Sequence, residues 1–256
     1  MRKQPKPAYI VAILLIVISL AYLFLNRSET PKTKTYEITV APGSTFEEML
    51  QALQKNRYLR HTLLYKDPGS VMSSLGNANQ DPEGEFYPGA YRLRPGVTDS
   101  ELLRVAYEKM QDELDNVWDN RAPNLPYRNS YELLIVASII EEETTVDEER
   151  PLVASVIVNR LNTHMPLAME SALRYGLQKF EAPLTAKDFR AGIPYNVYLK
   201  EGLPPTAISL PSASSLRAAA HPAYTQYLYF VATGNGTHKF FKTAKEYKAA
   251  MRKYQK

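Results

Sequence analysis

The hydrophobic pattern begins with an uncharged apolar run, Ala8 to Leu25 (AYIVAILLIVISLAYLFL), close to the N-terminus. As a helix, a run of this length crosses the hydrocarbon core of a bilayer. A cleaved signal peptide has a shorter apolar core and small residues at its cleavage site, whereas this run continues into Asn26 and Arg27. The pattern therefore predicts an uncleaved transmembrane anchor, with cleavage as the less favoured alternative.

Basic residues on both sides of this run bear on its orientation. Arg2, Lys3 and Lys6 precede the run, and Arg27 and Lys32 follow it, so the positive-inside rule favours a cytoplasmic N-terminus only slightly. The short tail before the run favours the same orientation. In a bacterium the rest of the chain then lies in the periplasm, attached by a single pass through the inner membrane.

The next part of the pattern predicts a small β-α-α-β unit. Apolar and polar residues alternate with the period of a strand from Tyr36 to Val40. Ser44, with Glu47 three residues later, has the pattern of a capping box that begins a helix. A second helical stretch is predicted from Leu59 to Leu75, and a strand from Ala90 to Leu93.

The rest of the chain is mainly helical by its pattern. A helix is predicted after Thr98 or Asp99. Another begins at Ser130 and contains Leu133 to Ile140 (LLIVASII), which is apolar nearly all round and predicts a helix buried on most sides. Three further elements are predicted: a helix from Asp147 (DEERPLVASVIVNRL), a hairpin turning at Asn235 and Gly236, and a C-terminal helix from Ala244 to Tyr254. The predicted fold class is therefore α+β.

Composition excludes several kinds of site. The 256 residues include no cysteine, which excludes disulfides and thiolate metal ligands, and the four histidines show no metal-ligand spacing such as HExxH. Three of the 31 basic residues, Arg2, Lys3 and Lys6, flank the apolar run, and the remaining 28 barely outnumber the 27 acidic residues. The net charge of +4 therefore does not indicate a basic face for nucleic acid.

The least expected pattern is the run Glu141 to Glu143, at the end of the buried helix (SIIEEETTVDEERP). Carboxylates near a helix C-terminus are destabilising by about 0.3–1 kcal/mol each, because the helix dipole is negative there. One interpretation is a frayed, solvated last turn. The other is that apolar surroundings and neighbouring acids raise the pKa of one glutamate, as a general acid near neutral pH requires. Asp147, Glu148 and Glu149 have a simpler interpretation, as the cap and solvated face of the next helix.

Several segments resemble, in the same order, the motifs of one protein family. They are EGEFYPGAYRL, ASIIEEETTVDEERPLVASVIVNRL, PYNVY, GLPPTAISLPSASSLRAAAHPA and YLYFVATGNGTHKF, spread over about residues 83 to 247. These segments resemble the endolytic murein transglycosylase (YceG-like) family. The resemblance implies a single-pass inner-membrane protein that cleaves peptidoglycan glycan strands internally, near sites of cell-wall synthesis.

The resemblance also implies a catalytic residue. In the family it is the first acid of a Glu-Lys-Glu-Thr motif, which falls on Glu141, while Glu142 occupies the lysine position. The implied reaction breaks the β-1,4 bond between N-acetylmuramic acid and N-acetylglucosamine without water. One carboxyl group protonates the leaving oxygen and then takes the proton of the muramoyl 6-hydroxyl, which leaves a 1,6-anhydro end. This lyase reaction involves no metal and no cofactor.

Other residues are candidates for substrate binding. Glu143 is expected beside the acid, and Asn159, in the motif VNRL, either binds glycan or caps its helix. The segment PYNVY offers stacking rings and an amide, although packing of a proline-rich loop explains it as well. Its candidate residues, Tyr195, Asn196 and Tyr198, are predicted to lie in the same groove as Glu141. His238 follows the hairpin turn and is interpreted as a surface residue.

One stretch departs from the family pattern and keeps other interpretations open. The family has Gln, Asp, Pro and Thr at the positions of Ala168, Glu170, Ser171 and Ala172, so two side chains able to hydrogen-bond substrate are lost. This departure favours a catalytically weak relative that serves as a periplasmic scaffold or glycan-binding partner of the cell-wall synthesis machinery. A third interpretation keeps the enzyme but makes it a hydrolase, should water reach C1.

Four segments are predicted in all. Residues 1–25 form a cytoplasmic tail and anchor, 26–35 a polar linker, 36–82 a LysM-like membrane-proximal unit, and 83–256 a mixed α+β catalytic domain with a C-terminal hairpin. LysM-like units are associated with glycan binding, and a spacer role is the alternative here. The expected partners are peptidoglycan glycan strands, the inner membrane and cell-wall synthases, and nucleic acid is not expected.

Overall fold

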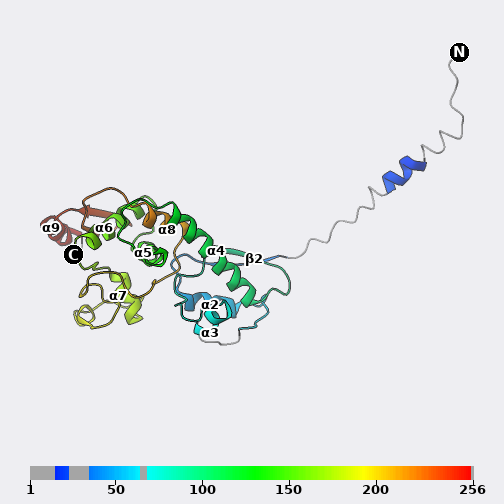
Figure 1. The fold of residues 1–256 in the computed structure, drawn as a ribbon, viewed down its shortest axis with the longest axis horizontal. Coiled ribbons are helices and arrows are strands. Elements are labelled where there is room, and N and C mark those ends of the chain that lie inside the picture. The colour runs from blue at the N-terminus through cyan, green and yellow to red at the C-terminus, as the bar shows by residue number, and fades with distance from the viewer. Residues whose placement is uncertain (1–14, 23–34, 64–67, 255–256) are drawn as a thin grey trace, which may run out of the picture. The chain divides into compact units, whose positions relative to one another are not determined.

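The computed structural model describes residues 15–22, 35–63 and 68–254. The chain divides into two compact units, residues 1–35 and 36–256, which are described separately (Figure 1). In the first unit, residues 15–22 form a helix with exposed apolar side chains. None of the helices in the described ranges is both long and apolar enough to cross a membrane. The predicted anchor, Ala8 to Leu25, extends on both sides of this helix, and its flanks and most of the predicted linker lie outside the described residues.

The second unit begins with the predicted order of elements, β-α-α-β. Its bounds are β1 (Tyr36–Val40), α2 (Phe46–Lys55), α3 (Pro68–Ser74) and β2 (Gly89–Leu93). Strands β1 and β2 pair antiparallel, with Tyr36 opposite Leu93 and Val40 opposite Gly89. The order is therefore confirmed, whereas the likeness to a LysM unit stays a prediction.

The N-cap of α2 is Thr45, one residue beyond the predicted Ser44. The Thr45 hydroxyl accepts a hydrogen bond from the Glu48 N–H at 3.2 Å, and the Glu48 carboxylate accepts one from the Thr45 N–H at 2.8 Å. Both Ser44 with Glu47 and Thr45 with Glu48 have the capping-box spacing, so the local pattern does not choose between them. The observed choice places Phe46 in the core.

The predicted helical stretch from Leu59 to Leu75 is wrong in its first half. Helix α3 begins only at Pro68, whose missing N–H and fixed φ suit the first turn of a helix. The residues before it bind the start of the next long helix instead. The Arg60 N–H donates to the Val97 carbonyl at 2.9 Å, and the Thr62 N–H donates to the Asp99 carboxylate at 2.9 Å. Residues 64–67 lie outside the described part of the chain.

Helix α4 (Asp99–Asp119) connects two hydrophobic cores. Thr98 caps it, as predicted, and Glu101 completes the capping box. Its first half contributes Leu102, Leu103 and Ala106 to a smaller core with α2, α3 and the β1–β2 sheet. Its second half contributes Met110, Leu114 and Val117 to a larger core. The smaller core therefore continues past residue 82, where the LysM-like unit was predicted to end.

The larger core is built around α5 (Ser130–Glu143). Every residue from Leu133 to Ile140 is buried, which confirms the predicted buried helix. Three helices contribute to the same core: α6 (Arg150–Asn162), α7 (Glu170–Leu177) and α8 (Ala213–Ala220). Figure 1 shows α5 surrounded by these helices. Helix α6 begins at Arg150, three residues later than predicted.

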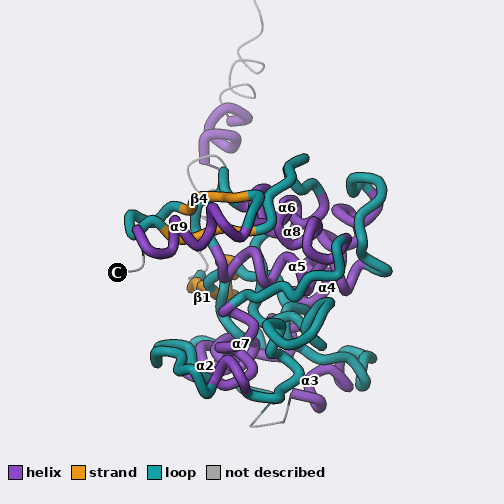
Figure 2. Tube along the Cα trace, turned by 90° about the vertical axis from the view of Figure 1, so that its left-hand side faces the viewer, coloured by secondary structure: helices purple, strands orange, loops and turns teal. Residues whose placement is uncertain are grey.

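The C-terminal part folds as predicted. Strands β3 (Tyr229–Ala232) and β4 (His238–Phe241) form an antiparallel hairpin, and α9 (Ala244–Tyr254) follows. Between α7 and α8 the chain runs through long loops with one short 3-10 helix, Asp188–Arg190. Figure 2 shows the hairpin and α9 at one end of the second unit and α2 and α3 at the other, with α5 between them.

The packing between the loop before β2 and α5 gives a first prediction. Gly84 has a φ of +83°, and a Cβ atom there would lie 2.5 Å from the Cβ of Ala207. Gly76 has a φ of +85° but open space around it, so it is a matched control. Gly84→Ala is expected to lower the free energy of unfolding by about 1–3 kcal/mol more than Gly76→Ala, because only the first adds overpacking to the backbone strain. Urea unfolding of both variants measures the difference, and equal losses would contradict this close packing.

Candidate active site

The three glutamates that end α5 point in different directions, because successive residues of a helix are about 100° apart. Glu141 faces α6 and α8. Glu142 faces the turn before α2, where a Cβ atom on Gly43 would lie 2.9 Å from the Glu142 Oε1 atom. Glu143 faces a pocket. The run of like residues therefore divides into three separate environments.

Glu141 lies in a buried ion pair. Its Oε2 atom is 3.0 Å from Nη1 of Arg150, and its Oε1 atom accepts a hydrogen bond from Nη2 at 3.1 Å. Ser212, the N-cap of α8, donates its N–H at 2.8 Å and its hydroxyl at 2.5 Å to Oε2. Only 7% of the Glu141 side chain and 8% of the Arg150 side chain is exposed. Both carboxylate oxygens are thus occupied by donors that the fold holds in place.

Arg150 extends this contact into a network of three helices. Its Nε atom donates to Asp147 at 2.9 Å, and Nη1 also donates to the hydroxyl of Ser215 on α8. The network joins the end of α5 to the starts of α6 and α8. Glu141 does not line the pocket that Glu143 faces.

Glu143 lines a pocket of about 550 Å³. The walls come from α5, α6, the start of α7, the loop after the 3-10 helix, the β3–β4 hairpin and α9. The charged and aromatic side chains that line it include Glu143, Arg160, Glu170, Tyr198, Tyr229, His238 and Tyr247. Aromatic walls with a few convergent polar groups are typical of a ligand site, and the tyrosines offer both flat rings and hydroxyls.

The surroundings favour the neutral form of Glu143. Burial raises the pKa of its carboxyl group above the usual value for glutamate. Hydrogen bonds from Ser171, whose hydroxyl lies 2.6 Å from Oε1, oppose this shift, while the charge of Glu170 adds to it. A carboxyl group that stays protonated closer to neutral pH can donate its proton to a bound ligand.

Geometry separates Glu143 from Glu142. The pKa of Glu142 is also raised, to about 7, chiefly by desolvation of its carboxyl group and also by the charges of Glu141 and Glu143, with a hydrogen bond from Ser209 in opposition, although the residue as a whole is exposed. However, Glu142 lies against Gly43 and does not line the pocket. Of the three glutamates, Glu143 alone combines a raised pKa with a place in the pocket wall.

His238 lines the same pocket and is paired with a carboxylate outside the lining, so its interpretation as a surface residue is wrong. Only 14% of its side chain is exposed. Its Nδ1 atom lies 2.7 Å from Oε2 of Glu149, and its backbone N–H donates to Oε1 at 2.7 Å. The predicted solvated position of Glu149 is wrong too, since that residue is buried.

The Glu149 contact fixes the orientation of the imidazole. Burial acts to raise the pKa of Glu149, but hydrogen bonds from His238 and Thr144 outweigh it and lower that pKa. The ionised Glu149 carboxylate is an acceptor, and Nδ1 of His238 lies within hydrogen-bond distance of it. The same imidazole belongs to a residue that lines the pocket.

Arg160 holds the pocket walls together. Its guanidinium donates to the backbone oxygens of Leu228 at 2.6 Å and Pro166 at 3.2 Å, and also to that of Leu167. The same group lies over the ring of Tyr229, 5.2 Å from its centroid. These contacts join the segment before β3 to the segment after α6, so Arg160 sets the spacing of two walls.

The loop residues predicted from PYNVY separate in the structure. Tyr198 lines the pocket with Glu143. Tyr195 does not: its hydroxyl lies 2.7 Å from Oγ1 of Thr206, and its ring packs edge-on against Tyr175. Roles for both in binding glycan stay predictions, and the structure brings Tyr198 alone of the two to the pocket.

The two predicted asparagines hold backbone segments. Asn196 is buried and donates to the carbonyl oxygens of Phe189 and Ala191 at 3.2 and 2.8 Å. Asn159 donates to those of Thr225 and Tyr227 at 3.1 and 2.9 Å. Their amide donors are occupied by these bonds, so both asparagines shape the loops around the pocket, and contact with substrate stays a prediction.

Among the charged and tyrosine residues of the pocket, four have no site role predicted from the sequence: Arg160, Glu170, Tyr229 and Tyr247. Glu170 is named there only as a departure from the family pattern. A signal existed for Arg160, because a charged residue in an otherwise apolar helix such as LVASVIVNRL must be paired when buried. The tyrosines carry no such signal, because aromatic residues in strands and C-terminal helices are common.

The fold and the pocket define a class of protein. It is an α+β protein in which the buried helix α5 presents the carboxylic acid of its last residue to a tyrosine-lined pocket. Within the described ranges no group of three or more histidine, aspartate or glutamate side chains is placed to hold a metal ion. Residues 19–253 match the model of the YceG-like family, and the chain belongs to that family.

Relatives with curated names support this membership. The chain is 30% identical over 236 residues to the endolytic murein transglycosylase of Bacillus subtilis, covering 86% of this chain and 65% of that one. It is 31% identical over 188 residues to the protein of the same name from Streptococcus pneumoniae, covering 71% and 32%. The chain thus spans about two thirds and one third of these relatives. The crystal structure of a putative YceG-like protein from Listeria monocytogenes matches with a TM-score of 0.70 and 26% identity, over 84% of this chain and 75% of that one.

A stability measurement tests the role of the Glu141 ion pair. Glu141→Ala is expected to lower the free energy of unfolding by about 3–5 kcal/mol, because it leaves the buried Arg150 without its main partner. Glu143→Ala, in the same helical turn, removes no ion pair and is expected to change it by less than about 1 kcal/mol. Urea unfolding at pH 7 compares the two variants. Similar losses in both would show that Glu141 has no special structural role.

Proposed function

We propose that this protein is an endolytic murein transglycosylase in which Glu143 carries the proton of the reaction. The observation that supports this role most directly is that Glu143 combines a raised pKa with a position in a tyrosine-lined pocket. The substrate class is supported by the names of the relatives from Bacillus subtilis and Streptococcus pneumoniae. The bond proposed to be cleaved is the β-1,4 bond from N-acetylmuramic acid to N-acetylglucosamine.

The reaction needs one carboxyl group in two successive roles. First, Glu143 donates its proton to the glycosidic oxygen, and the bond from this oxygen to C1 of N-acetylmuramic acid breaks, with the electron pair staying on the oxygen. Next, the Glu143 carboxylate takes the proton of the 6-hydroxyl of the same sugar, and that oxygen forms a bond to C1. Glu143 is protonated again, and the strand ends in a 1,6-anhydro sugar.

Neighbouring side chains suit this sequence of steps. The Ser171 hydroxyl donates to Oε1 of Glu143 at 2.6 Å and so orients the carboxyl group. The imidazole of His238, held by Glu149, is a further polar group of the lining that the sugar can contact. Tyr198, Tyr229 and Tyr247 provide the aromatic faces on which sugar rings stack.

The proposal moves the acid two residues from the sequence prediction. The resemblance assigned the role to Glu141, and this assignment stays a prediction. Against it stands the geometry, because Glu141 is occupied by Arg150 and Ser212 and does not line the pocket. A shift of two residues along a helix turns a side chain by about 200°, so the two assignments cannot share one pocket.

Two alternatives to the proposed lyase reaction are each supported by particular residues. Glu170 is a second carboxylate in the pocket wall, and paired carboxylates are typical of glycosidases that use water, so hydrolysis is one alternative. The other is a catalytically weak scaffold, favoured by Ala168 and Ala172 at positions where the family pattern has hydrogen-bonding side chains. Both alternatives keep murein glycan as the ligand.

Glutamate-to-glutamine variants test the assignment of the acid. Glu143→Gln is expected to lower the rate of glycan cleavage by about 10²–10⁴-fold, because glutamine cannot transfer the proton in either step. Glu142→Gln, outside the pocket, is the matched control and is expected to stay close to wild type. The rate for wild type is also expected to fall as pH rises past the raised pKa of Glu143, since the acid form is then lost. The measurement is digestion of purified peptidoglycan with mass spectrometry of the products.

The products of this digestion distinguish a lyase from a hydrolase and from a scaffold, and the variants distinguish Glu143 from Glu141 as the acid. Anhydro ends from wild type support a lyase, and reducing ends support the hydrolase alternative. Loss of cleavage in Glu141→Gln, with Glu143→Gln active and both variants folded, would return the role to Glu141. Glycan binding without any cleavage by wild type would favour the scaffold.

We propose further that the run Ala8 to Leu25 anchors the protein in the bacterial inner membrane, with residues 36–256 in the periplasm. The support is the length and lack of charge of this run. The full-length protein is expected to stay in the membrane pellet after carbonate extraction and to retain its N-terminal residues. Release of the intact protein, or an N-terminus beyond Leu25, would contradict the anchor.

A further inference from the structure

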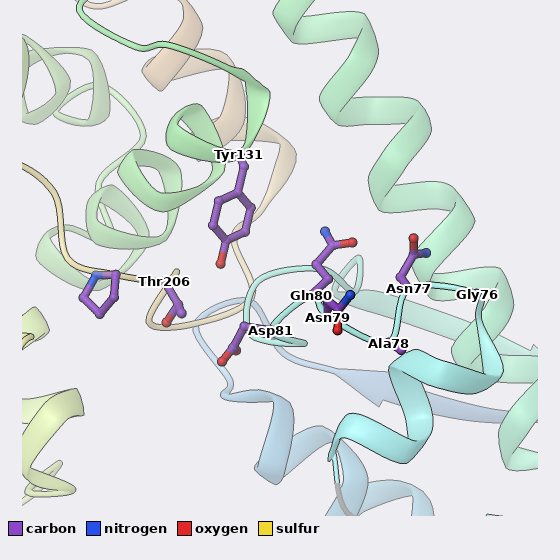
Figure 3. Close-up of a pocket in the computed structure, with 9 residues that line it drawn as sticks. Gly76, Asn77, Ala78, Asn79, Gln80, Asp81, Tyr131 and Thr206 are labelled. Atoms are coloured by element: carbon purple, nitrogen blue, oxygen red, sulfur yellow. The ribbon is translucent and has the colours of Figure 1, made fainter.

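A second pocket lies near the other end of α5 from Glu143. It has a volume of about 640 Å³ and is lined by residues 76–81 of the loop between α3 and β2, by Tyr131, and by Pro205 and Thr206 (Figure 3). Tyr131 is the second residue of α5 and Glu143 is the last. At 1.5 Å per residue, their backbones are about 18 Å apart along the helix. The two pockets therefore belong to one rigid element but are separate sites.

The side chains that line this pocket are polar and nearly uncharged. They comprise the amides of Asn77, Asn79 and Gln80, the carboxylate of Asp81, and the hydroxyls of Tyr131 and Thr206. The Thr206 hydroxyl is already engaged, because it donates to the Ala207 carbonyl at 2.7 Å and lies 2.7 Å from the Tyr195 hydroxyl. The lining contains no lysine, arginine or histidine among the described residues. Figure 3 shows the Tyr131 ring projecting from α5 toward the space between Thr206, Asp81 and Gln80.

The loop that forms one wall is held in place by its own contacts. Asn77 donates to the hydroxyl of Tyr107 at 2.8 Å, and Gln80 donates to the buried carboxyl of Glu85 at 2.5 Å. One oxygen of Asp81 accepts the Glu83 N–H at 3.0 Å, which leaves the other oxygen for a ligand. Asn79 and Asp81 are exposed. The wall is thus ordered without a ligand, while part of its hydrogen-bonding capacity faces outward.

We propose that this pocket binds a neutral N-acetylated sugar of the glycan strand, at a distance from the bond that is cleaved. Amide and carboxylate side chains pair with sugar hydroxyls and acetamido groups, and the Tyr131 ring offers a face for stacking. A stem peptide fits less well, because its carboxylates would meet Asp81 with no cation in the lining. The identity of the strand as substrate rests on the proposed function, but the chemistry of this pocket does not.

Such a site gives a reason for cleavage within a strand. A chain end that reaches Glu143 alone forms only the contacts of that pocket. A longer strand that also reaches Tyr131 gains a second set of contacts near the opposite end of α5. Binding at the two places raises the effective affinity for long strands without a change in the chemical step.

Binding measured without turnover tests the proposal. The probe is a tetramer of N-acetylglucosamine that carries a photoreactive diazirine, used with the full 256-residue chain. Mass spectrometry of the crosslinked peptides is expected to find the label on residues 76–81 or beside Tyr131, Pro205 and Thr206. Label confined to the pocket of Glu143 and Tyr198, or no label above background, would overturn the proposal. A free stem peptide that labels residues 76–81 more strongly than the sugar would overturn it as well.

Variants with matched controls give the second readout. Tyr131→Ala is expected to weaken tetramer binding in this pocket by up to about tenfold, and Tyr131→Phe, which keeps the ring, by much less. Asp81 lies on an exposed loop, so Asp81→Ala is expected to fold. This variant therefore still tests the pocket if Tyr131→Ala does not fold. With peptidoglycan, these variants should raise KM for long strands and leave kcat unchanged. Unchanged labelling and affinity in both Tyr131→Ala and Asp81→Ala would exclude the site, whether or not the protein cleaves murein.

Discussion

The ion pair between Glu141 and Arg150 is the contact on which the rest of the site depends. It joins the end of the buried helix α5 to the start of α6, and through Ser212 and Ser215 it also fixes the start of α8. A buried charge without its partner is strongly destabilising, so this arrangement defines one rotation of the last turn of α5. That rotation points Glu143 into the pocket and Glu142 toward Gly43.

The acidic run at an unfavourable helix end thereby has a physical explanation. Glu141 is neutralised by Arg150, whereas burial favours the protonated form of Glu143, so these two carboxyl groups of one helical turn do not repel as fully ionised carboxylates would. The same burial that makes Glu143 unfavourable as a carboxylate makes it suitable as an acid. The pair of Glu149 and His238 adds an oriented imidazole to the lining of the pocket.

Much of the fold could be predicted from local pattern, and less of the site. Strand β1, the start of α5 and the whole of α9 have the predicted bounds, because period and capping residues act over a few positions. The stretch before Pro68 was mistaken for helix, because its contacts with Val97 and Asp99 lie over thirty positions away. The location of an unusual acid was also visible in the sequence. The sequence does not show which glutamate faces the pocket. That choice depends on contacts of Glu141 with Arg150 and with Ser212, which is 71 residues away along the chain.

The most direct test of this account is the ionisation of Glu143 itself. Carbon-13 NMR of protein with labelled glutamate carboxyl groups, recorded from acid to neutral pH, follows each carboxyl, and the signal absent from Glu143→Gln identifies the residue. This signal is expected to titrate clearly above the usual value of about 4.3 for glutamate, because burial raises the pKa of Glu143. A Glu143 signal that titrates at or below that value would contradict the claim that the pocket holds a protonated acid.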